Sequence, residues 1–476
     1  MRRLSTLIVV SLLAATACRS GARFVPADAI VEGRTAEPFV ADTIDGPAEL
    51  SVDRGRWRER PRAANAVDFW ERITTLDLRG AERDARSFDE RTFVVALQML
   101  MEGDPESAAI AFRALHFSAT DAVVRGRSRA GLMIALAWRS DWPALAGIGA
   151  APDTASVIDS LAAQSGVERW GRALSGVVAQ PLEIPDAPVT LPLRRSAFGT
   201  PVVTVRVNGR AHEFWLDTGA SMTVLSSDAA VASRATLAAR DTLAISVIAG
   251  HIPARAVYID SLSIGGVVAR GLGAALVNPG VLRLDHRMVD GVRSSVAIDG
   301  VIGMDLLRQL DVTIDAIAGT ITLQRPARDP RAVRNLFWVG YPVVRLIAAD
   351  GTPMLFGLDT GAEVTYVTSA YLHQQPRTPV AVRHGAIGGL GGELQRTQWV
   401  AREVALSDGG FAMMLRNIPV APDRGWTFVR FDGVLGSDVM LASRVHLDFL
   451  NGVFEVRRSA SAPEDGSPDG ETGGGQ

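Results

Sequence analysis

The chain has few residues that can cross-link a small fold or bind metals: its 476 residues include one cysteine and seven histidines. It also contains no lysine. A single thiol cannot close an internal disulfide, so a disulfide framework is excluded. No histidines and cysteines fall at the spacing of a zinc site. The net charge of −3 predicts neither nucleic acid nor an anionic membrane surface as a partner. The composition therefore implies no metal, no organic cofactor and no nucleic acid.

Long apolar runs are missing as well, apart from one near the N-terminus. The stretch from Leu7 to Ala15 is too short to span a bilayer comfortably. It follows Arg2 and Arg3 and runs into the small-residue sequence Ala15-Thr16-Ala17. This order is typical of a secretory signal. We predict a signal peptide over residues 1–17 and an exported protein.

The lone cysteine, Cys18, comes directly after that cleavage pattern. Its position resembles a bacterial lipoprotein signal, in which the cysteine is acylated, although that family usually has leucine where this chain has Ala15. The resemblance implies lipid attachment at Cys18 and a location in the periplasm or cell envelope, with membrane contact only through the anchor. Ordinary signal cleavage, with Cys18 incidental, is the alternative.

Changes of composition divide the rest of the chain into regions. Residues 18–60 mix Pro, Gly, Asp and Arg without periodicity and are predicted to be a linker. Apolar residues then recur at helical spacing, which predicts a helical domain over residues 61–178. Its segment from Ala96 to Leu115 resembles half of a tetratricopeptide repeat, and a plain helical bundle is the alternative. Residues 459–476 are rich in Gly, Ser, Pro, Asp and Glu, lack apolar residues to bury, and are predicted to be a disordered tail.

An internal repeat lies between the helical domain and the tail. In each copy, alternating strands with hairpin signals lead to Asp-Thr-Gly-Ala, at 217–220 and at 359–362. A segment with the pattern Asp-Gly-Val-hydrophobic-Gly-x-Asp recurs at 299–305 and 432–438. The first landmarks are 142 residues apart and the second 133, so the first copy is nine residues longer. The repeat predicts two all-β lobes of one duplicated fold. The predicted lobes span residues 190–328 and 334–458.

The repeated aspartates point to acid–base chemistry. A carboxylate that follows a buried strand is costly to bury unless it is paired or hydrogen-bonded. Asp217 and Asp359 hold equivalent positions, so a pseudo-two-fold axis would bring them together. Close carboxylates cannot both ionise easily, and such a pair shares a proton and supplies one base and one acid. A base that activates water and an acid that protonates the substrate suit amide hydrolysis without a covalent intermediate.

Residues 195–458 resemble two retropepsin-like aspartic peptidase domains in one chain, as in bacterial aspartyl protease family proteins. The resemblance rests on the two Asp-Thr-Gly-Ala motifs and on Val301-Ile302-Gly303 and Val434-Leu435-Gly436, segments that in the family cross behind the active-site loops. It implies an aspartic endopeptidase acting on peptides or proteins, with Asp217 and Asp359 as the catalytic pair. The implied loop-supporting residues are Thr218, Gly219, Ala220, Thr360, Gly361 and Ala362.

The family also closes a β-hairpin flap over its substrate. In the second copy the candidate is the glycine-rich segment around Gly388 and Gly389. In the first copy it is the segment around Gly250 and His251, which contains much less glycine. One working flap over an asymmetric cleft is therefore an alternative to two equivalent flaps.

Residues next to the motifs differ from the family or between the copies. Glu363 stands where the first copy has Ser221, and it is expected to point outward and pair with an arginine. Neither Ala220 nor Ala362 can donate a hydroxyl hydrogen bond to a carboxylate. We therefore expect higher pKa values for the aspartate pair, and a less acidic optimum, than in family members with Ser or Thr there.

Several further expectations concern roles and partners. Asp305 and Asp438 are expected to cap short helices rather than take part in catalysis. The lobes should pair within one chain, which predicts a monomer, while pairing of each lobe with its copy in a second chain is the alternative. Because a fold does not guarantee its usual function, the second functional hypothesis is an inactive protein. Such a protein would bind peptides or cell-envelope components through the cleft and would offer the helical domain to a protein partner.

Overall fold

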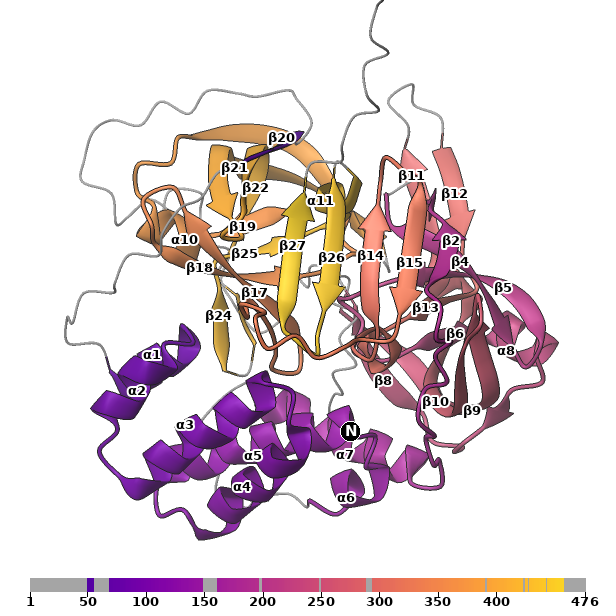
Figure 1. Ribbon diagram of the computed structural model, residues 1–476. Coiled ribbons are helices and arrows are strands. Elements are labelled where there is room, and N and C mark those ends of the chain that lie inside the picture. The colour runs from indigo at the N-terminus through magenta and orange to yellow at the C-terminus, as the bar shows by residue number, and fades with distance from the viewer. Residues whose placement is uncertain are drawn as a thin grey trace, which may run out of the picture.

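The computed structural model describes residues 49–54, 68–148, 161–196, 199–247, 250–287, 293–389, 392–422, 424–426, 428–441 and 443–457. The predicted signal peptide, Cys18, most of the predicted linker and the predicted tail lie outside these residues. A helical region over residues 69–174 is followed by two β-barrel lobes, which confirms the predicted fold class (Figure 1). Within the described ranges, no helix is both long and apolar enough to cross a membrane.

The helical region is built from helices with well-defined starts. Several begin after an Asp or Ser whose side chain accepts a backbone N–H of the first turn, which satisfies a donor that the helix itself leaves free. At Ser87, this bond and the return bond from Glu90 form a complete capping box. The helices are α1 (Phe69–Thr74), α2 (Leu78–Asp84), α3 (Phe88–Met101), α4 (Pro105–Ser118), α5 (Ala122–Trp138), α6 (Trp142–Ala146) and α7 (Leu161–Leu174).

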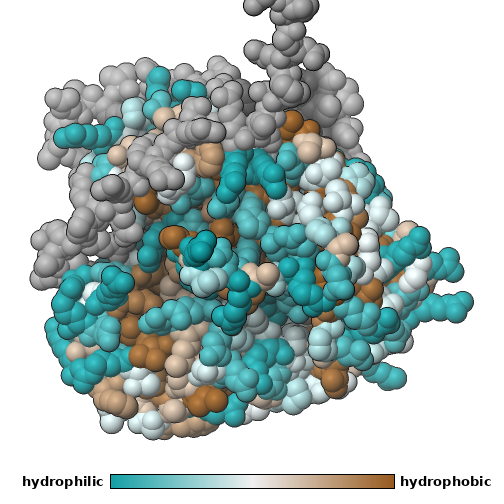
Figure 2. Space-filling view, in the orientation of Figure 1, coloured by the Kyte–Doolittle hydropathy of each residue, from teal (hydrophilic) through white to brown (hydrophobic). Residues whose placement is uncertain are grey.

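Aromatic side chains join the helical region to the second lobe. Phe93 of α3 and Phe112 of α4 are fully buried, with ring centroids 5.6 Å apart. Phe428, from the second half of the repeat, stacks on Phe112 and meets Phe93 edge to face. The helical region and the second lobe therefore share one hydrophobic core. The outer surface over α3 and α4 also carries hydrophobic side chains, at the lower left of Figure 2.

The β elements follow the repeat of the sequence. In the first lobe they are β2 (Val189–Pro192), β3 (Arg194–Arg195), β4 (Pro201–Val207), β5 (Arg210–Leu216), β6 (Val224–Ser226), α8 (Ser227–Ala232), β7 (Thr236–Leu237), β8 (Leu243–Val247), β9 (Gly250–Ile264), β10 (Val267–Val277), η2 (Pro279–Leu282), β11 (Arg283–Arg287), β12 (Arg293–Ala297), β13 (Gly300–Ile302), α9 (Met304–Leu307), β14 (Asp311–Asp315) and β15 (Thr320–Gln324). In the second lobe they are β16 (Leu336–Trp338), β17 (Pro342–Ala348), β18 (Pro353–Leu358), β19 (Tyr366–Thr368), α10 (Ser369–Gln374), β20 (Val380–Gly389), β21 (Gly392–Ser407), β22 (Phe411–Ala421), β23 (Arg424–Trp426), β24 (Val429–Phe431), β25 (Gly433–Leu435), α11 (Ser437–Leu441), β26 (Arg444–Asp448) and β27 (Val453–Arg457).

The two lobes are closed by the same strand order. In the first lobe the order is β4-β5-β13-β6-β10-β9, and β9 pairs back with β4. In the second lobe it is β17-β18-β25-β19-β22-β21, and β21 pairs back with β17. In both, the short strand of the hydrophobic-hydrophobic-Gly segment lies parallel to the strand that leads into Asp-Thr-Gly-Ala. The lobes are therefore two copies of one barrel, as the repeat predicts.

A separate sheet joins the lobes, in the order β2-β15-β14-β26-β27. Its centre is the antiparallel pair of β14, from the first lobe, and β26, from the second (Figure 1). Thr313 pairs with His446 there, and these two residues are equivalents in the repeat, 133 positions apart. The pseudo-two-fold axis therefore passes through this residue pair, as in an isologous interface.

One segment corrects the predicted linker over residues 18–60. Glu49–Arg54 forms a six-residue strand, β1, which pairs antiparallel with β22 at the edge of the second lobe's sheet. Strand β1 extends the sheet through main-chain hydrogen bonds, which need little from the side chains. The short segment shows no clear pattern in the sequence, and its place depends on a strand more than 350 residues further along the chain.

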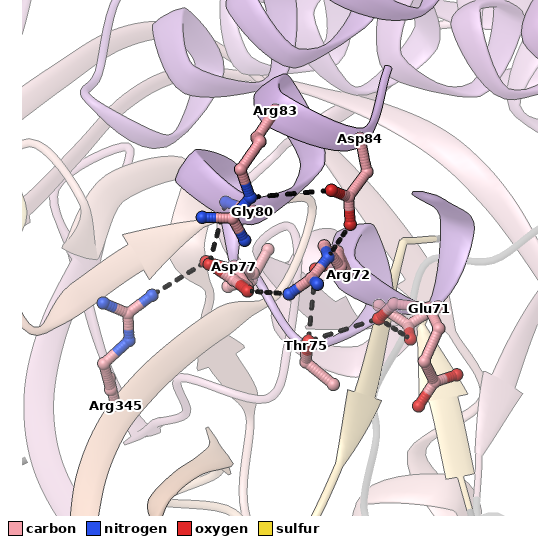
Figure 3. Close-up of polar contacts among 10 residues, drawn as sticks. Glu71, Arg72, Thr75, Asp77, Gly80, Arg83, Asp84 and Arg345 are labelled. Atoms are coloured by element: carbon pink, nitrogen blue, oxygen red, sulfur yellow. Dashed lines mark hydrogen bonds and ion pairs between the residues drawn. The ribbon is translucent and has the colours of Figure 1, made fainter. Parts of the chain in front are cut away.

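Polar contacts fix the first helices onto the second lobe (Figure 3). The buried Arg72 of α1 forms ion pairs with Asp77 and Asp84, which hold α1 and α2 together. Arg345 of β17 donates from Nη2 to the carbonyl oxygen of Leu76, between these helices, at 2.9 Å. The start of the helical region is thus held by a core and by specific hydrogen bonds.

Candidate active site

The two Asp-Thr-Gly-Ala loops start where β5 and β18 end, and each is backed by the short strand that runs parallel to it. The N–H of Asp217 donates to Ile302 O at 3.0 Å, and the N–H of Asp359 donates to Leu435 O at 2.9 Å. Both aspartates are almost completely buried, with 2% and 1% of their surface exposed. The barrel thus positions each carboxylate through its own main chain.

The loops are locked to each other by their threonines. The N–H of Thr218 donates to Thr360 Oγ1 at 2.9 Å, and the N–H of Thr360 donates to Thr218 Oγ1 at 3.0 Å. Each hydroxyl donates onward across the axis, Thr218 to Leu358 O at 3.0 Å and Thr360 to Leu216 O at 2.7 Å. Four hydrogen bonds therefore cross between the lobes, and both threonines are buried.

The glycines allow the carboxylates to meet. The N–H of Gly219 donates to Asp217 Oδ1 at 2.8 Å, and the N–H of Gly361 donates to Asp359 Oδ1 at 3.0 Å. A Cβ atom on Gly219 would collide with the Asp359 carboxylate, and one on Gly361 would lie 2.5 Å from Asp217 Oδ2. Each glycine thus faces the aspartate of the other lobe, so a side chain at either position would push the pair apart.

Burial and proximity raise both aspartate pKa values. Burial raises the pKa of Asp217 to about 6, although backbone N–H groups and the hydrogen bond with Asp359 oppose the shift. Burial, followed by the charge of Asp217, raises the pKa of Asp359 well above its ordinary value. The two carboxyl groups therefore titrate as one pair that shares a proton.

The alanines of the motifs contribute only their main chains. The N–H groups of Ala220 and Ala362 donate to the main-chain oxygens of Asp217 and Asp359, at 3.3 and 3.1 Å, and Ala362 N–H also lies 3.1 Å from Asp359 Oδ1. Both side chains are buried and bring no hydroxyl to the carboxylates. Glu363 is half-buried, and its carbonyl accepts a hydrogen bond from Ser437 Oγ at 3.2 Å. Its pairing with an arginine stays a prediction.

A second pair of equivalent contacts was not foreseen from the sequence. Thr223 Oγ1 donates to Asp305 Oδ1 at 3.0 Å, and Thr365 Oγ1 donates to Asp438 Oδ1 at 2.6 Å. The predicted helix caps at these aspartates are wrong, because both lie inside the first turn and the residue before α9 is Gly303. Each Asp instead ties the segment behind the loop to the chain that leaves the motif. The sequence feature that could have revealed these contacts is the threonine that ends Asp-Thr-Gly-Ala-x-x-Thr in both copies.

Another repeated aspartate supports the strands that carry the motifs. Asp299 accepts from Glu213 N–H at 3.1 Å, and Asp432 accepts from Leu355 N–H at 2.7 Å. These are equivalent positions of β5 and β18, two strands that end at the active-site loops. The first aspartate of the Asp-Gly-Val-hydrophobic-Gly-x-Asp segment therefore has a structural role. Its carboxylate takes the place of a main-chain acceptor for an N–H of the neighbouring strand.

Each lobe carries a long β-hairpin at the predicted flap position. Gly250 and His251 begin β9 and pair with Val247 and Ser246 of β8. In the second lobe, Gly388 and Gly389 end β20, which pairs along its whole length with β21. The tips, residues 248–249 and 390–391, lie outside the described residues. The less glycine-rich segment of the first copy thus also forms a hairpin, while closure over substrate stays a prediction for both.

The first hairpin contacts the helical region. Helix α7 packs on the first: Arg169 Nη2 donates to Thr242 O at 2.7 Å, and Trp170 Nε1 donates to Ala244 O at 3.4 Å. Trp170 is only 2% exposed and belongs to the same core cluster as residues of β8 and β9. Helix α7 is itself tied to α5 by the buried ion pair of Arg129 with Glu168. The first hairpin is therefore braced by the helical region.

Comparison with known proteins agrees with this geometry. Residues 203–306 match the family model described as aspartyl protease. Among solved structures, an aspartic proteinase from Irpex lacteus is 12% identical, with a TM-score of 0.35, and the match covers 57% of this chain and 97% of that chain. That overall likeness is too low to bear on function, and no curated protein matches the chain.

The matched segment begins within β4 and ends within α9, so it contains the first Asp-Thr-Gly-Ala loop and the strand behind it. The second lobe repeats these elements about the pseudo-two-fold axis. The β part of the chain thus contains two copies of one barrel, and the first copy matches the aspartyl protease model. Each copy contributes one Asp-Thr-Gly loop.

Proposed function

We propose that this chain is an aspartic endopeptidase whose site is completed within one molecule. The observation that carries the proposal is the reciprocal lock of Thr218 and Thr360, which brings the buried Asp217 and Asp359 together. A structural role alone would not require two buried carboxyl groups with raised pKa values, because an unpaired buried carboxylate is costly.

Burial and proximity raise both pKa values, so the pair can hold one ionised and one protonated carboxyl group. In this proposal Asp217 is the ionised base and Asp359 is the protonated acid. A water between them gives its proton to Asp217 while its oxygen attacks the peptide carbonyl, and Asp359 protonates the carbonyl oxygen. The tetrahedral intermediate then loses its C–N bond as the proton held by Asp217 passes to the leaving nitrogen, and one hydroxyl of the intermediate returns its proton to Asp359. No covalent bond to the protein forms.

Cleavage of a diverse peptide library, with product sequencing, tests the proposal. Wild type should release products, and Asp217→Asn and Asp359→Asn should each lower kcat by at least about a hundredfold, the scale of general acid–base catalysis. Asp186→Asn, at an exposed carboxylate outside the site, is the matched control. Binding of peptides by wild type without turnover would instead support the inactive, peptide-binding alternative.

We further propose that the protein acts outside the cytoplasm, anchored by a lipid on Cys18. The proposal rests on the order of basic, apolar and small residues ahead of that cysteine. Metabolic labelling with a radioactive fatty acid should mark wild type and leave Cys18→Ser unlabelled. Labelling of both proteins, or of neither, would contradict the anchor without affecting the peptidase proposal.

A further inference from the structure

The outer face of α3 and α4 carries the large exposed hydrophobic side chains of the helical region. Among the described residues of these helices, Phe88 is 76% exposed, Val95 45%, Ile110 68% and Phe117 72%. Single exposed apolar residues are common, but a contiguous group usually marks an interaction surface. Figure 2 shows hydrophobic surface over these two helices.

The four side chains form one stripe. Phe88 and Val95 are seven residues apart on α3, and Ile110 and Phe117 are seven apart on α4, so each pair lies on one helix face. The helices are antiparallel neighbours, and the N–H of Thr120 donates to Asp89 Oδ2 at 3.2 Å, which joins the start of α3 to the end of α4. Both phenylalanines therefore lie at one end of the stripe and the two aliphatic residues at its middle.

Charged residues on the same face are divided between the two ends. Arg91 on α3 and Arg113 on α4 are exposed and lie toward the phenylalanine end. Glu102 on α3 and Glu106 on α4 are exposed and lie at the opposite end. We call this face, from Phe88 to Glu102 and from Glu106 to Phe117, the α3–α4 face. It is apolar along its length, basic at one end and acidic at the other.

We propose that the α3–α4 face binds the same face of a second copy of this chain. A two-fold axis through the aliphatic middle would lay the basic end of each copy on the acidic end of the other and bury both apolar stripes. An anionic membrane would meet the acidic end unfavourably, and an entirely basic or acidic peptide would satisfy only one end. Self-association places Arg91 and Arg113 of each copy opposite Glu102 and Glu106 of the other.

Charge-reversed variants test the proposal by sedimentation velocity, which measures mass without depending on peptidase activity. Wild type should shift from monomer to dimer as its concentration rises. Arg91→Glu/Arg113→Glu makes both ends acidic, and Glu102→Arg/Glu106→Arg makes both ends basic. Each variant alone should dimerise about a hundredfold more weakly or not at all, because like charges then face each other. An equal mixture should dimerise again, since one face is then wholly acidic and the other wholly basic.

Three results would overturn the proposal. The first is a wild type that stays monomeric at every concentration, the second is variants that dimerise as well as wild type, and the third is a mixture that fails to associate. Unchanged circular dichroism and melting would show that the exposed substitutions leave the fold intact. Binding of the wild-type face to anionic vesicles in place of a second copy would likewise contradict it.

Discussion

At the scale of single residues, the main feature is the burial of two carboxyl groups in one place. Asp217 and Asp359 are buried, and burial raises both pKa values. Ionisation of the pair is therefore less favourable in the folded protein than in the unfolded chain. The four hydrogen bonds of Thr218 and Thr360 help to hold the loops in this arrangement. The buried pair lowers the free energy of unfolding, and contacts elsewhere in the fold compensate for this loss.

Asp217→Asn should stabilise the protein at neutral pH. Between the ordinary pKa of 3.8 and the folded value of about 6, the unfolded chain has lost a proton that the folded chain retains. The folded state binds more protons in this window, so wild-type stability falls as pH rises through it. We expect a gain of roughly 1 to 3 kcal/mol in unfolding free energy above pH 6. Thermal melts that show the same gain below pH 3.8 would contradict the cause.

Ala220→Ser and Ala362→Ser should move the activity optimum to lower pH. A hydroxyl at either position would donate to a carboxylate and favour its ionised form, which lowers the pKa values of the pair by about one unit. Ala230→Ser, at a buried alanine of α8, is the matched control. The measurement is the pH profile of kcat/KM; an optimum that stays in place or rises would count against this role of the alanines.

Much of the site was predictable from the sequence because each motif of the repeat occurs twice. The two Asp-Thr-Gly-Ala motifs and the glycine segments behind them could be matched by position alone. The partners of Asp305 and Asp438 were missed, because a buried aspartate after glycine reads equally well as a helix cap. Hydrogen bonds between residues about 80 positions apart leave no periodic pattern in a sequence.

At the scale of elements, helix α7 supports the hairpin of the first lobe. Arg169 and Trp170 of α7 donate to main-chain oxygens just before and within β8. The sequence placed both hairpins but gave no sign of the brace, because α7 reaches β8 across more than 70 residues. The likeness of the lobes in sequence thus gives no sign of the contact between α7 and the first hairpin.

Arg169→Ala combined with Trp170→Phe should loosen the first hairpin alone. The double variant removes two hydrogen bonds to β8 and its leading residue, while the phenyl ring keeps most of the apolar packing. We expect amide hydrogen exchange over residues 243–256 to become about tenfold faster, since each lost bond is worth about 1 kcal/mol. Exchange over residues 380–401 is the internal control. Equal acceleration in both hairpins would mean global destabilisation rather than the loss of a brace.

At the scale of the whole molecule, the lobes and the helical region are joined at several places. Arg308 of the first lobe donates to the carbonyl oxygens of Met304 and of Trp138, the last residue of α5. Trp138 also meets Trp338 of β16 edge to face, with ring centroids 5.9 Å apart. The end of α5 thus contacts both lobes. The helical region is therefore part of the framework that sets the position of one lobe against the other.

The contact of His446 with Asp311 makes the joint between the lobes depend on pH. His446 Nε2 lies 2.8 Å from Asp311 Oδ1, across the pair of β14 and β26. The hydrogen bond that His446 donates to Asp311 raises the His446 pKa against partial burial. Burial alone would raise the pKa of Asp311, but hydrogen bonds from His446 and Gln324 outweigh it and lower the pKa.

His446→Gln should therefore destabilise most in mildly acidic solution. The histidine contribution is full below its ordinary pKa of 6.5 and is lost as pH rises through the raised folded value. The Asp311 contribution is present above 3.8 and is lost as pH falls through the lowered folded value. We expect a loss of at most about 1 kcal/mol near pH 5, because the pair is partly solvent-screened. Chemical denaturation that shows a larger loss above pH 8 would contradict this assignment.

The pairing of Thr313 with His446 within one chain affects how assembly of the site depends on protein concentration. A site assembled from two separate chains exists only above the concentration at which they associate. Here residues 325–335 connect β15 to β16, so the partner half is always within reach and its effective concentration is set by the connection, not by expression. The dyad would stay assembled at any dilution. The fraction of molecules with an assembled dyad would therefore not depend on the number of copies in a cell.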